Sequence, residues 1–219
     1  MRLNRYIASS TLFSRRKADE LIATGRVVVN REKANLGTVV NDDDIVLVDG
    51  SRIYPEQKIR VVLLHKPTGY VCSRDGQGSP TVYDLLQKGM HDLKIAGRLD
   101  KDSSGLVVLT NDGKLLQDLT HPSNDNEKLY IIGLSKHLAD GDIAKFATGV
   151  DIGDERVSKL EVIPMTAPMQ YEVRIHEGRN RQIRRSFEAL GYHVVSLHRT
   201  KLGAFSIENL APKQFKTEG

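Results

Sequence analysis

The spacing of apolar residues along the chain predicts short helices and strands rather than long elements. Apolar positions recur at helical spacing in residues 3–7 and again in residues 15–24. Ser14 is a suitable N-cap for the second of these helices, and Gly25 is well placed just after its end. Two short apolar runs follow and predict strands at residues 27–29 and 45–48. Helices followed by a small sheet within about 55 residues predict a compact first module.

A polar stretch with Pro55, residues 51–58, has neither helical nor strand periodicity, and we interpret it as a linker. The chain beyond it alternates strand and helix patterns, which predicts a larger second domain. Strands are predicted at residues 60–65, 106–109, 127–132, 149–153, 160–165, 171–176 and 194–197, with a weaker one near Phe205. Helices are predicted at residues 82–86, 115–119 and 139–146 and from about residue 181 to Leu190, ahead of Gly191.

Residues 95–113 combine a buried strand pattern with a polar loop. The unbroken apolar run 106–109 ends at the turn residues 111–113, and residues 97–105 ahead of it hold two aspartates and two serines. A polar loop that leads into a core strand gives exposed groups a rigid base, which favours chemistry at this place. The alternative is a surface turn in which Asp100, Lys101 and Asp102 are simply solvated.

Length and composition exclude several classes of protein. A chain of 219 residues can form a sizeable core and two domains. No apolar run approaches the ~20 residues of a membrane span, and no signal-peptide core follows the basic start. Cys72 is the only cysteine, so an internal disulfide and a multi-cysteine metal site are excluded. We therefore expect a cytoplasmic protein, and we take it to be a monomer.

Positive charge is concentrated in two segments although the net charge is only +4. Residues 1–33 hold eight Lys and Arg against three Asp and Glu, and residues 168–201 hold seven against three. The rest of the chain is mildly acidic. Two basic segments on an acidic body favour a polyanionic partner such as nucleic acid, although solvated basic helices would have the same composition.

Four arginines surround the start of the predicted helix near residue 181. Arg184 follows the apolar Ile183, so its side chain can reach the edge of the core. An arginine within ~4–6 Å of an aspartate keeps the carboxylate charged, as a nucleophile or base requires. The alternative is a surface pair with Glu188, worth about 0.3–0.5 kcal/mol.

The first module resembles the alpha-L type of RNA-binding domain. The resemblance rests on R-L-N-R-Y-I-A at 2–8, S-R-R-K-A-D-E-L-I at 14–22, G-R-V-V-V-N at 25–30 and D-I-V-L-V-D-G at 44–50. In that family a basic helical face lies on structured RNA, where phosphate contacts supply affinity and salt sensitivity more than sequence readout. The resemblance implies phosphate contacts by Arg2, Arg5, Arg15, Arg16 and Lys17.

The remaining motifs resemble those of RNA pseudouridine synthases of the RsuA/RluB/RluF type. They are L-L-H-K-P-T-G-Y-V-C-S at 63–73, A-G-R-L-D-K-D-S-S-G-L-V-V-L-T-N-D-G at 96–113, E-K-L-Y at 127–130 and E-G-R-N-R-Q-I-R-R-S-F-E-A-L-G at 177–191. Together with the first module, the resemblance covers nearly the whole chain. It implies isomerisation of uridine to pseudouridine in ribosomal RNA or in an immature ribosomal subunit, without cofactor or metal.

The resemblance also implies roles for single residues. Asp100 is the catalytic carboxylate, Tyr130 stacks on the target base and is placed for proton transfer, and Arg184 pairs with Asp100. Leu197 occupies an apolar pocket position, although it and Tyr130 could equally be core residues. We expect further RNA contacts from Arg98, Arg179 and Arg181.

The expected fold class is α+β. Residues 1–58 should form the alpha-L domain, and residues 59–219 a pseudouridine synthase domain with a bent, mainly antiparallel mixed sheet flanked by helices. Two other functions stay open: a non-enzymatic rRNA-binding or assembly factor, and a metal-dependent nuclease using Asp100 and Asp102. The seven histidines show no H-x₃-H spacing, which weakens the metal hypothesis. Large-subunit RNA is weakly favoured over small-subunit RNA as the substrate.

Overall fold

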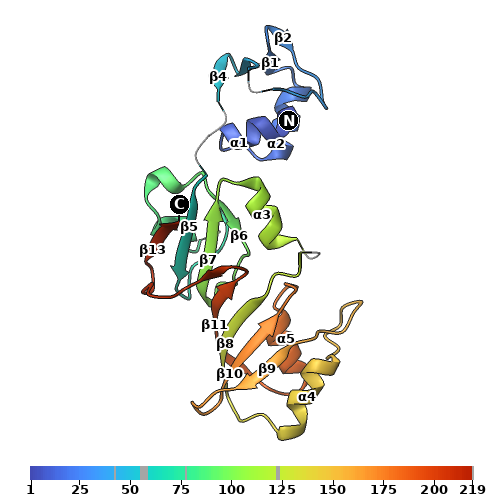
Figure 1. The fold of residues 1–219 in the computed structure, drawn as a ribbon, viewed down its shortest axis with the longest axis vertical. Helices are drawn as coiled ribbons and strands as arrows, with labels where there is room; N and C mark the ends of the chain where they lie inside the picture. The colour runs from blue at the N-terminus through green and yellow to red at the C-terminus, as the bar shows by residue number, and fades with distance from the viewer. Residues whose placement is uncertain (42, 55–58, 77, 122–123, 219) are drawn as a thin grey trace. The chain divides into compact units, whose positions relative to one another are not determined.

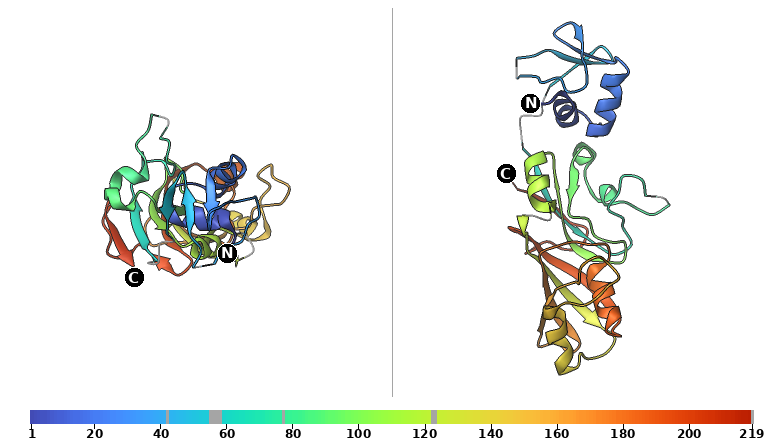
Figure 2. Two further views of the ribbon diagram at one scale, coloured as in Figure 1. Left: turned by 90° about the horizontal axis from the view of Figure 1, so that it is seen from above. Right: turned by 90° about the vertical axis from the view of Figure 1, so that its right-hand side faces the viewer.

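The computed structural model describes residues 1–41, 43–54, 59–76, 78–121 and 124–218, and the chain forms two compact units (Figures 1 and 2). The first unit comprises Met1–Arg60 with Asn111–Gly113, and the second comprises Val61–Thr110 with Lys114–Gly219. Each unit encloses hydrophobic core residues of its own. The expected boundary after residue 58 falls at residues 55–58, which lie outside the described part of the chain.

Two amphipathic helices open the first unit, α1 (Leu3–Ser10) and α2 (Arg15–Ala23). Their apolar faces are buried against one another and against the small sheet of this unit. The Ser14 side chain accepts a hydrogen bond from the backbone N–H of Lys17 at 3.1 Å, which caps α2 as its sequence predicts. Both predicted helices are confirmed.

The sheet of the first unit has four short strands in the order β2-β1-β3-β4. They are β1 (Val27–Val29), β2 (Glu32–Lys33), β3 (Val46–Val48) and β4 (Ser51–Ile53). The expectation that the linker starts at Ser51 is wrong, because β4 pairs with β3. Asp49 (φ 51°) and Gly50 (φ 78°) form the hairpin turn between them. Asp-Gly is a strong hairpin signal, so the sequence did contain the information.

A nine-stranded sheet runs through the second unit in the order β13-β5-β7-β11-β8-β10-β9, with β6 beside β7 and β12 beside β11. Its strands are β5 (Val61–Lys66), β6 (Lys94–Ala96), β7 (Ser104–Thr110), β8 (Lys128–Leu134), β9 (Glu161–Pro164), β10 (Gln170–Ile175), β11 (Val194–Leu202), β12 (Phe205–Ser206) and β13 (Phe215–Glu218). Every named strand pair is antiparallel except β7 with β11. The mainly antiparallel mixed sheet was expected.

The parallel pair is short and depends on a glycine. His198 and Arg199 of β11 lie opposite Ser104 and Gly105 of β7. Gly105 has φ +112°, and a Cβ atom there would lie 2.2 Å from the backbone oxygen of Arg199. Only glycine allows the two backbones to approach this closely. The contact brings β11 directly beside the loop that precedes β7.

Helices pack on one side of the β8–β10–β9 part of the sheet. Phe146 of α4 (Asp140–Thr148) and Phe187 of α5 (Gln182–Ala189) stack with ring centroids 4.3 Å apart, and both are fully buried. Burying each ring stabilises the fold by about 1.5–3 kcal/mol. A smaller cluster forms under α3 (Gly113–Thr120), and the remaining helical turns are η1 (Val82–Leu85) and η2 (Lys88–Met90).

The predicted elements of this unit form with three differences in its strands. Residues 149–153 form only an isolated bridge between Val150 and Ser158 instead of a strand. Two strands are absent from the prediction: β6, which pairs with β7, and β13, which covers the outer edge of β5. The polar alternation F-K-T-E of β13 buries little, so apolar periodicity does not reveal it.

Candidate active site

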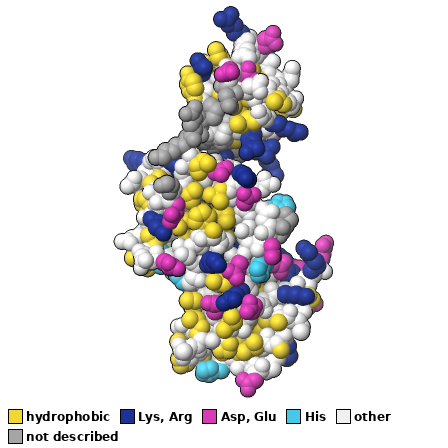
Figure 3. Space-filling model, viewed as in Figure 1, with side chains coloured by type: hydrophobic (Ala, Val, Ile, Leu, Met, Phe, Trp, Pro, Cys, Tyr) yellow, Lys and Arg dark blue, Asp and Glu magenta, His cyan; other side chains and the backbone are white. Residues whose placement is uncertain are grey.

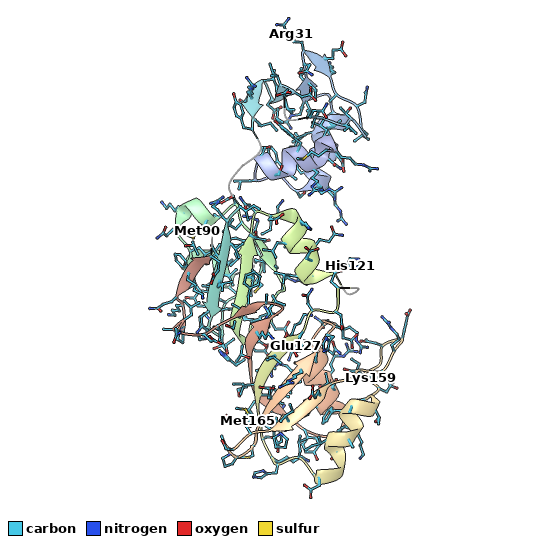
Figure 4. The ribbon with its side chains drawn as sticks, in the orientation of Figure 1. Arg31, Met90, His121, Glu127, Lys159 and Met165 are labelled. Carbon is cyan, nitrogen blue, oxygen red and sulfur yellow. The ribbon has the colours of Figure 1, made fainter. Side chains whose placement is uncertain are left out.

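A cavity of about 740 Å³ lies in the second unit at the ends of several strands. Its walls come from the loop before β7, from β8, from the segment between β10 and α5, and from β11. The sequence-predicted residues that line it are Arg98, Asp100, Tyr130, Arg179, Arg181 and Leu197. Figure 4 labels His121, another lining residue, where the chain leaves α3.

The loop that carries Asp100 is held from below by two buried cations. Lys66 Nζ donates to the backbone oxygens of Asp100 at 2.9 Å and of Ser103 at 2.5 Å. Arg199 donates from Nε to Leu106 O at 2.9 Å and from Nη2 to Gly97 O at 2.5 Å. Carbonyls spaced three residues apart, at 97, 100, 103 and 106, therefore all accept from these two side chains. We call Lys66 and Arg199 the floor cations.

The floor cations are unusual because they are buried without a carboxylate. Lys66 is 0% exposed and Arg199 is 1% exposed. Among the described residues neither has an Asp or Glu side chain within ion-pair distance, and their hydrogen bonds go to backbone carbonyls. Burial lowers the pKa of Lys66, and the nearby Asp100 and Asp102 act in the opposite direction. Carbonyl dipoles replace part of the lost hydration.

Asp100 faces the cavity, with its side chain 36% exposed. The guanidinium of Arg181 lies 3.7 Å from Asp100 Oδ2 and 3.2 Å from Asp102 Oδ1. Arg181 itself adopts left-handed backbone angles (φ 47°, ψ 30°) at the N-cap position of α5. Such a conformation costs about 1–3 kcal/mol for a residue other than glycine and is often found at functional sites.

Arg184 contacts the other aspartate, so the predicted ion pair between Arg184 and Asp100 is not formed. Its Nε lies 3.3 Å from Asp102 Oδ2, and its Nη groups donate to Asp102 O at 3.0 Å and Val194 O at 2.7 Å. The side chain is only 11% exposed. The backbone oxygen of Asp102 accepts a hydrogen bond from one Nη group of Arg184, and this bond directs the guanidinium towards residue 102. The surface pair with Glu188 is not formed either.

Tyr130 and Leu197 form an apolar wall of the cavity. They are 6% and 8% exposed, and they lie on neighbouring strands, since Arg199 pairs with Tyr130 and Leu197 with Ile132. Among the described residues the Tyr130 hydroxyl has no hydrogen-bond partner, so it is available to a ligand. The side chain thus presents an aromatic surface and a hydroxyl to the cavity.

The guanidinium of Arg179 is already occupied, which argues against the predicted RNA contact. It binds Asp154 Oδ2 at 3.2 Å, Glu177 Oε1 at 2.7 Å and the backbone oxygens of Arg156 and Val157. Arg185 also pairs with Asp154, at 2.6 Å, and these arginines lower the pKa of the Asp154 carboxyl by hydrogen bonding and charge. Arg179 therefore anchors the loop at residues 154–157. Arg98, by contrast, is exposed at the cavity.

Sequence reasoning missed both floor cations. The sequence contained two signals. Lys66 follows the apolar run V-V-L-L-H at the end of a predicted strand, and Arg199 lies within the segment 194–202, which forms a strand. A charge within a core strand is rare unless it has partners. The partners lie 34 to 102 residues away, so the sequence could not name them.

The basic residues of the first unit lie on its surface. Arg2, Arg5, Arg15 and Arg16 are exposed, whereas Lys17 is half-buried and pairs with Glu20 at 2.5 Å. Within the described residues no group of three or more His, Cys, Asp or Glu side chains could hold a metal ion. No described helix combines the length and apolar character needed to cross a membrane.

Comparison with known proteins agrees with this geometry. The family profile described as RNA pseudouridylate synthase matches residues 60–189, and the S4 domain profile matches residues 1–46. The chain therefore belongs to the RNA pseudouridylate synthase family, a family of isomerases, and carries an RNA-binding S4 domain at its N-terminus. The resemblances stated from the sequence motifs are confirmed.

Individual relatives match over almost the full chain. Ribosomal small subunit pseudouridine synthase A of Escherichia coli strain K12 is 37% identical over 99% of this chain and 95% of the relative. The dual-specificity RNA pseudouridine synthase RluF of Shigella flexneri is 37% identical over 96% of this chain and 72% of the relative. A crystal structure of a pseudouridylate synthase superimposes with a TM-score of 0.72 at 30% identity, covering 100% of this chain and 96% of that one.

Proposed function

We propose that this enzyme converts a specific uridine of ribosomal RNA into pseudouridine, with Asp100 as the catalytic carboxylate and without a cofactor. The observation that carries the proposal is the place of Asp100. It lies in a cavity of about 740 Å³, on a loop held by the floor cations, opposite an apolar wall that contains Tyr130. The names of the full-length relatives support ribosomal RNA as the substrate.

The reaction is an isomerisation, so atoms and electrons balance within the substrate. The bond between C1′ and N1 breaks, the uracil turns, and a bond forms between C1′ and C5. The proton at C5 is lost and N1 ends with a proton. Asp100 acts either as a nucleophile at C1′ or as a base on the sugar, and both roles need the charged carboxylate. In this proposal the Tyr130 hydroxyl, which lines the same cavity, takes part in moving the C5 proton.

Opening the RNA is the other requirement of the reaction. A uridine inside a stack must turn out before it can enter the cavity, which costs a few kcal/mol. Stacking on Tyr130 and contact with Leu197 offset part of that cost. The exposed guanidinium of Arg98 is a candidate contact for the backbone of the extruded nucleotide.

Arg181, the N-cap residue of α5, and Arg184, in its first turn, take different parts in this proposal. Arg181 is the cation that faces the Asp100 carboxylate, at 3.7 Å. Arg184 holds residue 102, two positions further along the same loop, through its contacts to the Asp102 side chain and backbone. Arg184 therefore acts on Asp100 through the loop rather than by a direct ion pair.

The ribosomal subunit that supplies the substrate is open to a direct test. The sequence analysis favours large-subunit RNA, whereas the relative matched over 95% of its length is named for the small subunit. Both RNAs, free and in immature subunits, should therefore be offered to the enzyme. We keep the expectation of a monomer that works in the cytoplasm, with RNA bound by the S4 domain through Arg2, Arg5, Arg15 and Arg16.

The decisive experiment maps pseudouridine by carbodiimide-dependent reverse-transcription stops on ribosomal RNA. We expect the wild type to produce a stop at one uridine, and Asp100→Asn to lose about 10³-fold or more of the rate while RNA affinity is kept. The variant removes one charge from the cavity but no phosphate contact. Asp140→Asn, an exposed carboxylate on α4, is the matched control and should remain active.

The outcomes separate this proposal from its two rivals. Tight RNA binding without any stop, on free RNA and on immature subunits alike, would favour a binding or assembly factor. Strand cleavage that a chelator abolishes would favour a nuclease. Substantial turnover by Asp100→Asn would remove Asp100 from the catalytic role even if the reaction itself is pseudouridine formation.

A further inference from the structure

A second cavity, of about 800 Å³, adjoins the candidate active site within the same unit. The two cavities share Ile175, His176 and Glu177 as lining residues. These residues lie at the end of β10 and in the turn that follows it. The two cavities therefore meet at this turn.

The interior of the second cavity is apolar. Leu160 and Ile175 contribute buried side chains, and Ala147 near the end of α4 completes this surface. Val157 lies at the cavity with its side chain 48% exposed. An apolar hollow with an exposed valine is typical of a binding site and costs free energy when it faces water.

Within the described part of the chain, two cations at this cavity have no carboxylate partner, whereas each acidic residue that lines it lies close to a basic side chain. Glu177 pairs with Arg179 at 2.7 Å, Glu161 lies 3.9 Å from Arg174, and Asp125 Oδ1 lies 3.2 Å from the imidazole of His176. Arg156 and Lys159 also line the cavity, and among the described residues neither has a carboxylate partner.

The two unpaired cations are presented outwards by a fixed backbone. Arg179 donates to the backbone oxygens of Arg156 and Val157, at 2.5 and 3.0 Å. Figure 4 labels Lys159 on the segment between α4 and β9, and Figure 3 shows Lys and Arg side chains beside acidic ones along that edge of the second unit. The second cavity, with Arg156 and Lys159 at its edge, therefore suits a ligand that has an apolar face and a negative charge.

We propose that this cavity binds a nucleotide of the substrate RNA that flanks the target uridine, an inference that rests on the proposed function. The base of that nucleotide lies on Val157 and the apolar interior, and a phosphate beside it is bound by Arg156 and Lys159. Extruding a uridine disturbs its neighbours, whose bases then need a surface to stack on. A nucleotide has the required combination of an apolar face and an anion.

Cross-linking tests the location directly. Cys72 is 8% exposed but lines the active-site cavity, so the protein with Cys72 alone is labelled in parallel as the background. Val157→Cys adds a thiol that can be labelled with a short benzophenone maleimide. Val195→Cys is the matched control, because Val195 is also an exposed valine, 59%, and lines neither cavity. Cross-links and pseudouridine are mapped on the same ribosomal RNA by reverse transcription.

We expect the probe at position 157 to cross-link within a few nucleotides of the pseudouridine, and the probe at 195 not to do so. Cross-links at 157 that are scattered along the RNA, or no more frequent than at 195, would overturn the subsite. So would a cross-link from 157 to a ribosomal protein when immature subunits are used. If the wild type forms no pseudouridine at all, the proposed function fails and the subsite fails with it.

Charge removal tests the phosphate contact. For the double variant Arg156→Gln with Lys159→Gln we expect KM to rise about tenfold at unchanged kcat, and the salt dependence of RNA binding to fall by about one charge. The control is Lys88→Gln with Lys213→Gln, two exposed lysines that line neither cavity. Arg156→Lys should keep most of the affinity. Equal effects of the two double variants would overturn the proposal while pseudouridine formation stands.

Discussion

The floor and the rim of the active-site cavity hold cations in opposite ways. On the floor, Lys66 and Arg199 are almost fully buried and donate to backbone carbonyls of the loop that carries Asp100. On the rim, Arg181 and Arg184 pair with carboxylates of that loop, and Arg181 is 44% exposed. Floor cations therefore act on the backbone alone, whereas the rim arginines also neutralise carboxylate charge, and Arg184 does both.

The difference has an energetic consequence. A carbonyl that loses its buried donor has no water to replace it, and each such loss costs about 1–3 kcal/mol. A carboxylate at the rim that loses its arginine can be hydrated, because Asp100 and Asp102 are 36% and 48% exposed. Substitution of a floor cation should therefore lower both stability and activity, whereas substitution of a rim arginine should lower mainly activity.

The largest effect should come from Lys66→Met. The substitution keeps much of the volume but leaves the backbone oxygens of Asp100 and Ser103 without their donor. Removing a buried charge offsets part of that loss, so we expect the second unit to lose about 2–4 kcal/mol of stability in urea unfolding. Lys88→Met, at an exposed position, should change little. A Lys66→Met protein as stable as the wild type would contradict the distinction between floor and rim.

The next effect separates the two rim arginines. Arg184→Gln removes a side chain that is 11% exposed and binds both Asp102 and Val194, so we expect kcat to fall about 10²-fold. Arg181→Gln removes an exposed guanidinium 3.7 Å from Asp100, and we expect a fall of about tenfold. Single-turnover rates measure both. A larger loss for Arg181→Gln would show that the charge facing Asp100 matters more to the rate than the anchoring of residue 102 by Arg184.

A smaller effect is expected from the exposed cations of the first unit, which have neither role. Arg15→Gln with Arg16→Gln should leave folding unchanged, weaken RNA binding, and reduce the slope of log K against log salt by about one to two. Filter binding over a range of salt concentrations measures this. An unchanged slope would show that α2 of the S4 domain does not lie on phosphate.

The smallest effect concerns the same strand as Arg199. His198 is half-buried, accepts or donates a 2.9 Å hydrogen bond with Ser104, and lies beside His65 with ring centroids 5.1 Å apart. Burial, followed by the charge of His65, lowers the pKa of His198. A buried histidine can lose its proton and become neutral, whereas a buried arginine stays charged.

The sign of the resulting pH dependence follows from linkage. With a lowered pKa in the folded state, the unfolded chain binds more protons below about pH 6.5, so stability falls as the pH falls through that region. We expect His198→Gln to lose less stability than the wild type between pH 7.5 and 5 in thermal unfolding. Parallel curves for the two proteins would show that His198 is not the group responsible.

Much of the local structure could be predicted from the sequence. The helix at 15–23 begins at its predicted cap Ser14, and the strand at 104–110 stops at the predicted turn. The motifs led to Asp100 and Tyr130, and the structure places both at one cavity. These features depend on apolar spacing and on turn chemistry within a few residues, which a sequence shows directly.

Tertiary structure alone decided which charges meet. Asp100 and Asp102 are two residues apart, and so close a spacing does not reveal that Arg181 and Arg184 both contact Asp102 while only Arg181 also lies near Asp100. The contacts of the floor cations span even longer distances in the sequence. The register of β5, β7 and β11 brings Lys66 and Arg199 to the loop 97–106. Buried charges have to find partners wherever the sheet brings them, whereas helices and strands form from neighbouring residues. The sequence therefore determined most of the elements and the motif that contains Asp100, and the sheet determined how that motif is held.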